Sequence, residues 1–134
     1  MARLAAIGPR PTEPEPILWA DEPALRELIA ALRSGTETDW SLEVPPASGP
    51  GAPLGRLVVS VSDGPLRVGA SAADLQLTGS TASLRQLADY LEQYADHNDL
   101  TEPEMHTHVW DHPAMPWISV GTELEVAGWW PPAE

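Results

Sequence analysis

The sequence contains no cysteine and no lysine, and it has few basic residues of any kind. The absence of cysteine excludes disulfide bonds and metal sites built from thiolates. No stretch approaches the roughly 18 consecutive apolar residues that a membrane-spanning helix requires, so we expect no membrane association. Seven arginines stand against 20 Asp and Glu residues, which gives a formal net charge of -13. Because this charge repels phosphate backbones and attracts basic partners, we expect no binding to nucleic acid.

The shortage of positive charge is greatest at the C-terminal end. Residues 86–134 contain no Arg or Lys, but they hold ten Asp and Glu residues, all four His and four of the six Trp. A segment with only negative fixed charge, together with imidazole and indole side chains, attracts cations. Two kinds of cation fit this description, a basic protein surface and a metal ion.

The length of 134 residues favours one domain. Residues 1–16 include the proline-rich stretch 9–16, where fixed φ angles and missing backbone donors oppose a helix or a central strand. We expect residues 1–16 to form a mobile arm. Residues 17–134 are predicted to form a single domain with a Pro- and Gly-rich loop at 45–55. The first eight residues do not have the pattern of a signal peptide, so we expect a cytoplasmic location.

Local patterns predict two helices. The first is expected to begin after an N-cap at Asp21 and to end at Gly35. The second is expected to begin at Ser80 or Thr81 and to reach about residue 97, where Asn98 favours a left-handed stop. One face of this second helix is apolar, and the residues at its spacing are Leu84, Leu87, Ala88, Leu91 and Tyr94. We expect Leu84, Leu87 and Leu91 to form the centre of the core.

Alternating apolar residues predict several strands, and Asp63-Gly64 between two of them is a strong hairpin signal. The predicted strands are Thr38–Val44, Arg56–Ser62, Leu66–Ala70, Asp74–Gly79, Met105–Asp111 and Trp117–Val126. This order of elements predicts an α+β fold. We expect an antiparallel β-sheet of about five to six strands, with one long helix packed on a face and a second, N-terminal helix.

A His-Thr-His sequence lies within one of these strands. Successive side chains of a strand point to opposite faces, so His106, His108 and Trp110 share one face. On the next strand, Trp117 is expected to face the same way, which would form an open patch of two His and two Trp. Two His at this spacing can also ligate a metal ion, with His112, Asp111 or Glu104 as a further ligand. We favour a role in supporting the sheet or an interface, without a metal.

The sequence offers little catalytic machinery. There is no Gly-rich loop that leads into a helix with Lys, and no Gly-x-Ser-x-Gly turn. Glu123 and Glu125 share a strand face, but such a pair is more often solvated charge than a general acid and base. The carboxylates of Asp89, Glu92 and Asp96 lie on one face of the second helix, and we interpret them as a solvated face. We therefore expect no enzymatic activity and no cofactor.

Four short segments between residues 66 and 126 carry a resemblance to a known family. They are the strand Leu75-Gln76-Leu77-Thr78-Gly79, the helix Ser83-Leu84-Arg85-Gln86-Leu87-Ala88, the strand His106-Thr107-His108, and a final strand with Ile118 and Val120. In this order they resemble the immunity protein 32 family of bacterial polymorphic toxin systems. The resemblance implies a small intracellular protein that binds and neutralises a cognate toxin.

Charge, aromatic content and resemblance point to the same class of function. We expect a small acidic binding protein, an immunity-type inhibitor that neutralises a basic toxin or effector through tight protein–protein binding. The predicted partner-binding residues are Trp110, Trp117, His106, His108, Glu123 and Glu125. Two alternatives stay open: a metal-binding protein or hydrolase that uses His106 and His108, and an acidic structural subunit or dimerisation module. The oligomeric state is not predicted.

Overall fold

A computed structural model describes residues 3–8, 16–43, 53–71, 73–100 and 105–128. In this part of the chain the structure has two helices and two β-sheets, so the fold is α+β as predicted. The elements are, in chain order, β1 Leu4–Ile7, β2 Ile17–Ala20, α1 Glu22–Ser34, β3 Thr38–Ser41, β4 Pro53–Leu54, β5 Arg56–Val61, β6 Arg67–Ser71, β7 Asp74–Gly79, α2 Thr81–His97, β8 His106–Trp110 and β9 Glu123–Gly128.

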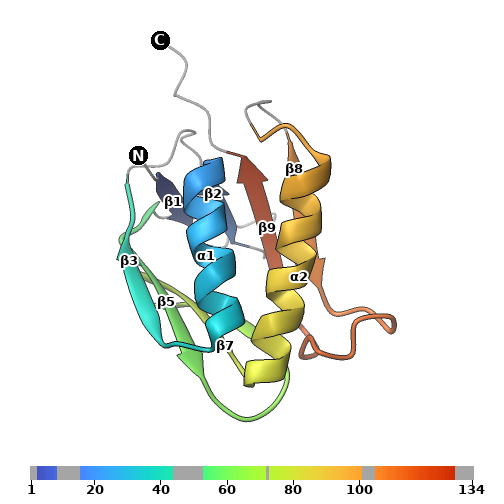
Figure 1. Ribbon diagram of the computed structural model, residues 1–134. Coiled ribbons are helices and arrows are strands. Elements are labelled where there is room, and N and C mark those ends of the chain that lie inside the picture. The colour runs from blue at the N-terminus through green and yellow to red at the C-terminus, as the bar shows by residue number, and fades with distance from the viewer. Residues whose placement is uncertain (1–2, 9–15, 44–52, 72, 101–104, 129–134) are drawn as a thin grey trace.

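The strands form two sheets, although the sequence analysis predicted one. One sheet, here called sheet A, has the order β4-β1-β2-β9-β8, and the other, sheet B, has the order β3-β5-β7-β6. Both sheets are mixed rather than antiparallel, because β2 runs parallel to β9 and β5 runs parallel to β7. The two helices lie side by side and antiparallel in front of the strands (Figure 1). Neither helix is long and apolar enough to cross a membrane, within the part of the chain that the structure describes.

Helix α1 has the predicted ends. The Asp21 side chain accepts a hydrogen bond from the Ala24 backbone N–H at 2.9 Å, and Pro23 lies in the first turn, where its missing N–H costs nothing. The helix ends at Gly35, whose φ of 69° is the left-handed conformation that glycine adopts without strain.

Helix α2 begins as predicted but ends differently. The Ser80 side chain caps it by accepting from the Ser83 N–H at 3.1 Å. Asn98 does not adopt the predicted left-handed conformation, because its φ of -137° and ψ of 153° are extended. Its side-chain amide instead donates to the Tyr94 carbonyl at 2.8 Å, which satisfies one of the free carbonyls at the helix end without a left-handed turn.

The predicted hairpin around Asp63-Gly64 is wrong in its pairing. Gly64 does turn the chain, with a φ of 98°, but β7 lies between β5 and β6 and pairs with both. The connection over residues 62–66 has to span two strand spacings, roughly 9–10 Å, which a few extended residues reach easily. The Gly64 carbonyl accepts from the Ser80 N–H at 2.9 Å, so the turn is bound to the start of α2.

The expected mobile arm contains a buried strand. Residues 4–7 form β1, which pairs with β2 on one side and with β4 on the other, inside sheet A. All four side chains are buried. The prolines that suggested an arm begin only at Pro9, and residues 9–15 lie outside the described residues. The strand itself is a short apolar run without alternation, a pattern typical of a strand buried on both faces.

The final strand is shorter than predicted. It begins at Glu123 rather than Trp117, because Gly121 has a φ of 83° and turns the chain just before it. Ile118 is buried and bridges to Leu66, as expected of a core residue. Val120 is 90% exposed, so it does not share the buried side of Ile118, as alternation along a strand over 117–126 would require. Alternation does not apply across residues 117–122, since they do not form a strand.

The core is confirmed at its centre. Leu84 and Leu87 have no exposed surface, and Leu91 is 1% exposed. They belong to one apolar cluster that takes residues from both helices and both sheets. A second, smaller cluster consists of Ala5, Ile7, Ile17, Trp19 and Ala127. The strand register places this second cluster on the face of sheet A that points away from the main core.

We predict that Leu87→Ala destabilises the protein by roughly 2–5 kcal/mol, because it removes a fully buried side chain and leaves a cavity. The free energy of unfolding from denaturant titration measures this change. Val120→Ala is the matched control, because the Val120 side chain lies in solvent. A loss below ~0.5 kcal/mol for Leu87→Ala, the range of ordinary surface substitutions, would contradict the observed packing.

Candidate functional site

Strand β8, which carries the His-Thr-His sequence, lies at the edge of sheet A and pairs with β9. The Gly128 N–H donates to the Met105 carbonyl at 2.9 Å, and the Asp111 N–H donates to the Thr122 carbonyl at 3.2 Å. Met105 and Asp111 flank β8 and are both odd-numbered, and hydrogen-bonded pairs alternate with non-hydrogen-bonded pairs along an antiparallel ladder. His106, His108 and Trp110 therefore occupy the non-hydrogen-bonded pairs. Side chains approach most closely in such pairs, where the Cα atoms are about 4.5 Å apart.

The inner face of β8 packs on α2, as the alternation predicts. Val109 is fully buried. The Tyr90 hydroxyl donates to the His108 carbonyl at 2.7 Å and lies 2.6 Å from the Thr107 hydroxyl. A phenol has one proton to donate, so the Thr107 hydroxyl is the donor of the shorter bond. Tyr94 adds a bond from its hydroxyl to the Met105 carbonyl at 3.0 Å. Two tyrosines of α2 therefore hold the backbone of β8 in place.

The outer face of β8 carries three aromatic rings in a row. The ring centroids of His106 and His108 lie 5.0 Å apart at an interplanar angle of 88°. The His108 and Trp110 rings are stacked, with centroids 5.3 Å apart and an angle of 22°. Trp110 is 46% exposed, so this row of rings presents a large apolar side chain to solvent. The predicted placement of these three side chains on one face is confirmed.

Two carboxylates of β9 lie beside these rings. Glu125 is the cross-strand partner of His108, and Glu123 is the partner of Trp110. The distance between His108 Nε2 and Glu125 Oε1 is 4.0 Å, and the Glu125 side chain is only 19% exposed. We call the set His106, His108, Trp110, Glu123 and Glu125 the outer-face patch. The second apolar cluster adjoins it on the same face, since Ile17 is the register partner of Glu125.

Trp117 does not belong to the outer-face patch, although the sequence analysis placed it there. It is half-buried and packs against the main core, and its ring centroid lies 6.5 Å from that of Tyr90 on α2. The reason is that residues 117–122 form turns, so the alternation that predicted its direction does not exist. The patch therefore has one tryptophan rather than two.

The third candidate metal ligand, His112, lies in the turn that follows β8. Its Nδ1 atom accepts a hydrogen bond from the Ala114 N–H at 3.0 Å. Among the described residues, which include all four His, no three His, Asp or Glu side chains are arranged to hold a metal ion. His106, His108 and His112 therefore do not form a three-ligand site, and Glu104 lies outside the described residues.

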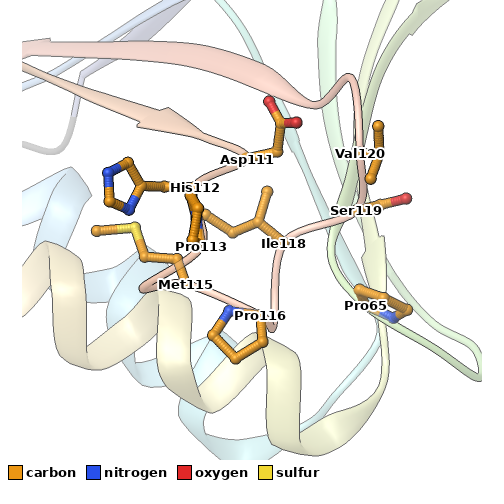
Figure 2. Close-up of a pocket in the computed structure, with 9 residues that line it drawn as sticks. All are labelled: Pro65, Asp111, His112, Pro113, Met115, Pro116, Ile118, Ser119 and Val120. Atoms are coloured by element: carbon orange, nitrogen blue, oxygen red, sulfur yellow. The ribbon is translucent and has the colours of Figure 1, made fainter.

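The turn around His112 lines an open depression of about 540 Å³ (Figure 2). Its walls are mainly apolar, with three prolines, and the polar side chains are Asp111, His112 and Ser119. Figure 2 shows His112 and Met115 on one side of the depression, and Pro65 and Val120 on the other. His112 and Ser119 both line it, and Figure 2 shows them on different sides of the depression.

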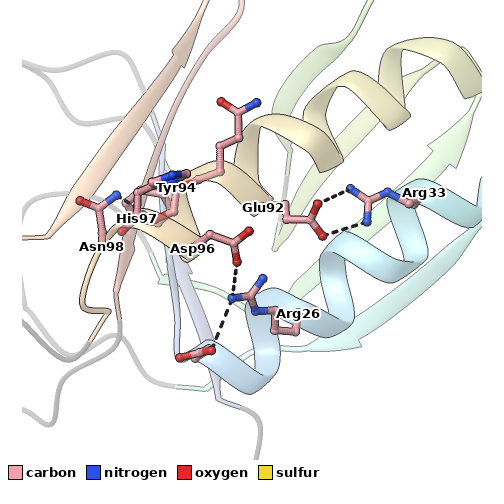
Figure 3. Close-up of polar contacts among 9 residues, drawn as sticks. Arg26, Arg33, Glu92, Tyr94, Asp96, His97 and Asn98 are labelled. Carbon is pink, nitrogen blue, oxygen red and sulfur yellow. Dashed lines mark hydrogen bonds and ion pairs between the residues drawn. The ribbon is translucent and has the colours of Figure 1, made fainter.

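The acidic face of α2 is exposed to solvent as expected, and it also binds the arginines of α1 (Figure 3). Arg33 contacts Asp89 at 2.9 Å and Glu92 at 3.0 Å, and Arg26 contacts Asp96 at 2.8 Å. Hydrogen bonds to these carboxylates raise the pKa of both guanidinium groups above the ordinary value. Each pair is partly exposed, so each stabilises the helix pair only slightly.

The other arginines with an ion pair also lie away from the outer-face patch. Arg56 pairs with Asp74 at 2.9 Å and with Asp39 at 3.6 Å on sheet B, and Arg3 pairs with Glu43 at 3.5 Å. Within the described ranges, no ion pair joins an arginine to Glu123 or Glu125. The patch therefore keeps its negative charge, apart from the imidazoles beside it.

Comparisons with known proteins add no relative: no protein-family model, no curated protein and no solved structure matches this chain. The resemblance to the immunity protein 32 family thus stays a prediction.

The Tyr94 hydroxyl lies beneath β8, and its burial changes the pKa of this side chain. Burial raises the pKa of Tyr94 to about 12, and the Glu125 carboxylate acts in the same direction, while a backbone interaction with Gly128 opposes them. An unfolded tyrosine ionises near pH 10, so the folded state holds its proton longer. We predict that the stability Tyr94 contributes is complete below about pH 10 and is lost as the pH rises toward about 12.

A phenolate absorbance titration measures this directly, because the chain has only two tyrosines. Tyr94→Phe should remove the later ionisation step. Should both tyrosines of the wild-type protein ionise together near pH 10, the burial of the Tyr94 hydroxyl would be refuted.

Proposed function

We propose that this protein is a small acidic binding protein, an immunity-type inhibitor that neutralises a cognate basic toxin or effector. The observation that supports the proposal is the register of β8 on β9, which brings His108 and Trp110 next to Glu125 and Glu123. The combination of an exposed indole with neighbouring carboxylates is typical of the energetic centre of an interface with a basic protein.

The physical properties of the patch suit tight binding. Trp110 offers a large, rigid surface that loses little conformational entropy on burial. Its neighbour His108 is stacked on it, and the backbone beneath is held by Tyr90. A surface that is already ordered before binding loses less conformational entropy when the complex forms. The net charge of -13 would in addition accelerate the encounter with a basic partner.

The resemblance to the immunity protein 32 family supports the same proposal from a different side. It implies an intracellular protein that binds and neutralises a toxin, which agrees with a cytoplasmic, acidic inhibitor. The alternative of a hydrolase is less well supported, because His112 and Ser119 lie on different sides of the depression (Figure 2).

The first test uses growth rescue. A toxin domain encoded beside this gene is produced in a host cell together with the wild-type chain or with Trp110→Ala. We predict that the wild-type chain restores growth and that Trp110→Ala weakens binding by at least ~2 kcal/mol, mainly through faster dissociation. Val61→Ala, a change at a partly exposed apolar residue of sheet B, is the matched control. Equal rescue and equal dissociation rates for Trp110→Ala and Val61→Ala would count against the patch.

A second test distinguishes an effect on the association rate from an effect on the dissociation rate. Reversing the charge at Glu123 and Glu125 should mainly slow association and weaken its dependence on salt, because partly exposed charges steer a partner more than they retain it. Stopped-flow or biosensor measurements at several salt concentrations give both rates. Charge reversal at Glu27, which is exposed on α1, is the control for the change in net charge. If Glu27→Lys slows association as much per charge as the double variant, the steering is general and the patch has no special part in it.

A further inference from the structure

The pair formed by Trp110 and Glu123 places an aromatic ring and a carboxylate at one exposed position. The two residues are directly opposite each other in a non-hydrogen-bonded pair, where side chains lie closest. The stacked His108 ring covers one side of the indole, and the 46% exposure of Trp110 leaves the remaining indole surface open to a partner. A group that docks on this surface meets the Glu123 carboxylate beside it.

The chemistry of this position selects among cations. A guanidinium is planar and weakly hydrated, so it can stack on an indole while its N–H groups donate to a carboxylate at the ring edge. A lysine ammonium is compact and strongly hydrated, so it gains less from contact with the indole and cannot make a planar bidentate hydrogen-bonded pair with the carboxylate. The arrangement therefore favours arginine over lysine.

The described arginines that form ion pairs form them away from Glu123. Arg26 and Arg33 are engaged with α2, and Arg56 is engaged on sheet B. Glu123 makes no ion pair with any arginine in the portion of the chain that the structure describes. Beside it, the Glu125 side chain is 19% exposed, and its Oε1 lies 4.0 Å from His108 Nε2. The patch thus has two carboxylates and an open indole that are complementary to a positively charged planar group.

We propose that Trp110 and Glu123, supported by His108 and Glu125, form a guanidinium-binding site that takes an arginine side chain of the basic partner. This inference rests on the proposed function and names the side chain that the partner inserts. The stacked His108 fixes the indole, and Glu125 adds a second negative charge two residue pairs further along the ladder, at the next pair on the same face.

The experiment uses two short capped peptides that alternate threonine with arginine or with lysine and are otherwise identical. Each is titrated into the full-length protein, and binding is followed by the nuclear magnetic resonance signal of the Trp110 indole N–H, assigned by its loss in Trp110→Phe. We expect the arginine peptide to bind about three- to tenfold more tightly than the lysine peptide. Its binding should shift the Trp110 signal.

Two variants test the roles of the residues. Glu123→Gln should lower the affinity of the protein for the arginine peptide by about three- to tenfold. It should also reduce the preference of the protein for the arginine peptide over the lysine peptide. Glu27→Gln removes the same charge from α1 and should leave the preference unchanged. Both substitutions are at residues with solvent exposure, and matching thermal melting curves confirm that the fold is intact.

Several outcomes would overturn the inference. Equal affinities for the two peptides would mean that the patch responds to charge alone, and the inhibitor proposal would survive through its own growth-rescue test. No effect of Glu123→Gln would exclude this carboxylate as the ligand. A dimer in sedimentation that dissociates in Glu123→Gln would show that a second copy of the chain is the occupant. Loss of rescue in Trp110→Ala, together with an unchanged preference of this variant for the arginine peptide in isothermal titration calorimetry, would overturn the guanidinium-binding site and leave the inhibitor proposal standing.

Discussion

The antiparallel pairing of β8 with β9 is the constraint on which the candidate site depends. The register decides which side chains of β8 face the helices and which face outward, because a shift of one residue would exchange the two sets. Thr107 and Val109 are bound to the inner side, the first by a hydrogen bond to Tyr90 and the second by full burial. With these two residues fixed inside, His108 and Trp110 have to lie outside.

The distribution of arginine explains why the outer face stays negative. The chain has seven arginines. Four of those that the structure describes form ion pairs, with acids on α1, α2 and sheet B and with Glu43 after β3. In α1 and α2 they join two helices that would otherwise carry an unbalanced acidic face. None of these ion pairs involves Glu123 or Glu125, so the charge of the outer-face patch comes from its own carboxylates and the imidazoles beside them.

Local features of the fold could be predicted from the sequence, and long-range features could not. The cap at Asp21, the stop at Gly35 and the buried stripe around Leu87 depend on neighbours within a few residues. The parallel pairing of β7 with β5, which places β7 between β5 and β6, joins strands that are not consecutive, and no local pattern reveals it. For the site, alternation correctly predicted the direction of Trp110 but failed at Trp117, since Gly121 interrupts the strand on which the prediction relied.

The two faces of β8 are subject to different physical demands. On the inner face, removing the Tyr90 hydroxyl or enlarging Val109 would disturb a close-packed core, where small volume changes are costly. On the outer face, Trp110 and Glu123 contact solvent, and a substitution there changes few contacts within the protein. A strand of this kind can alter what it binds while keeping its place in the sheet. Under the proposed function, the partner constrains Trp110 and Glu123 on the outer face, and the core constrains Val109 on the inner face.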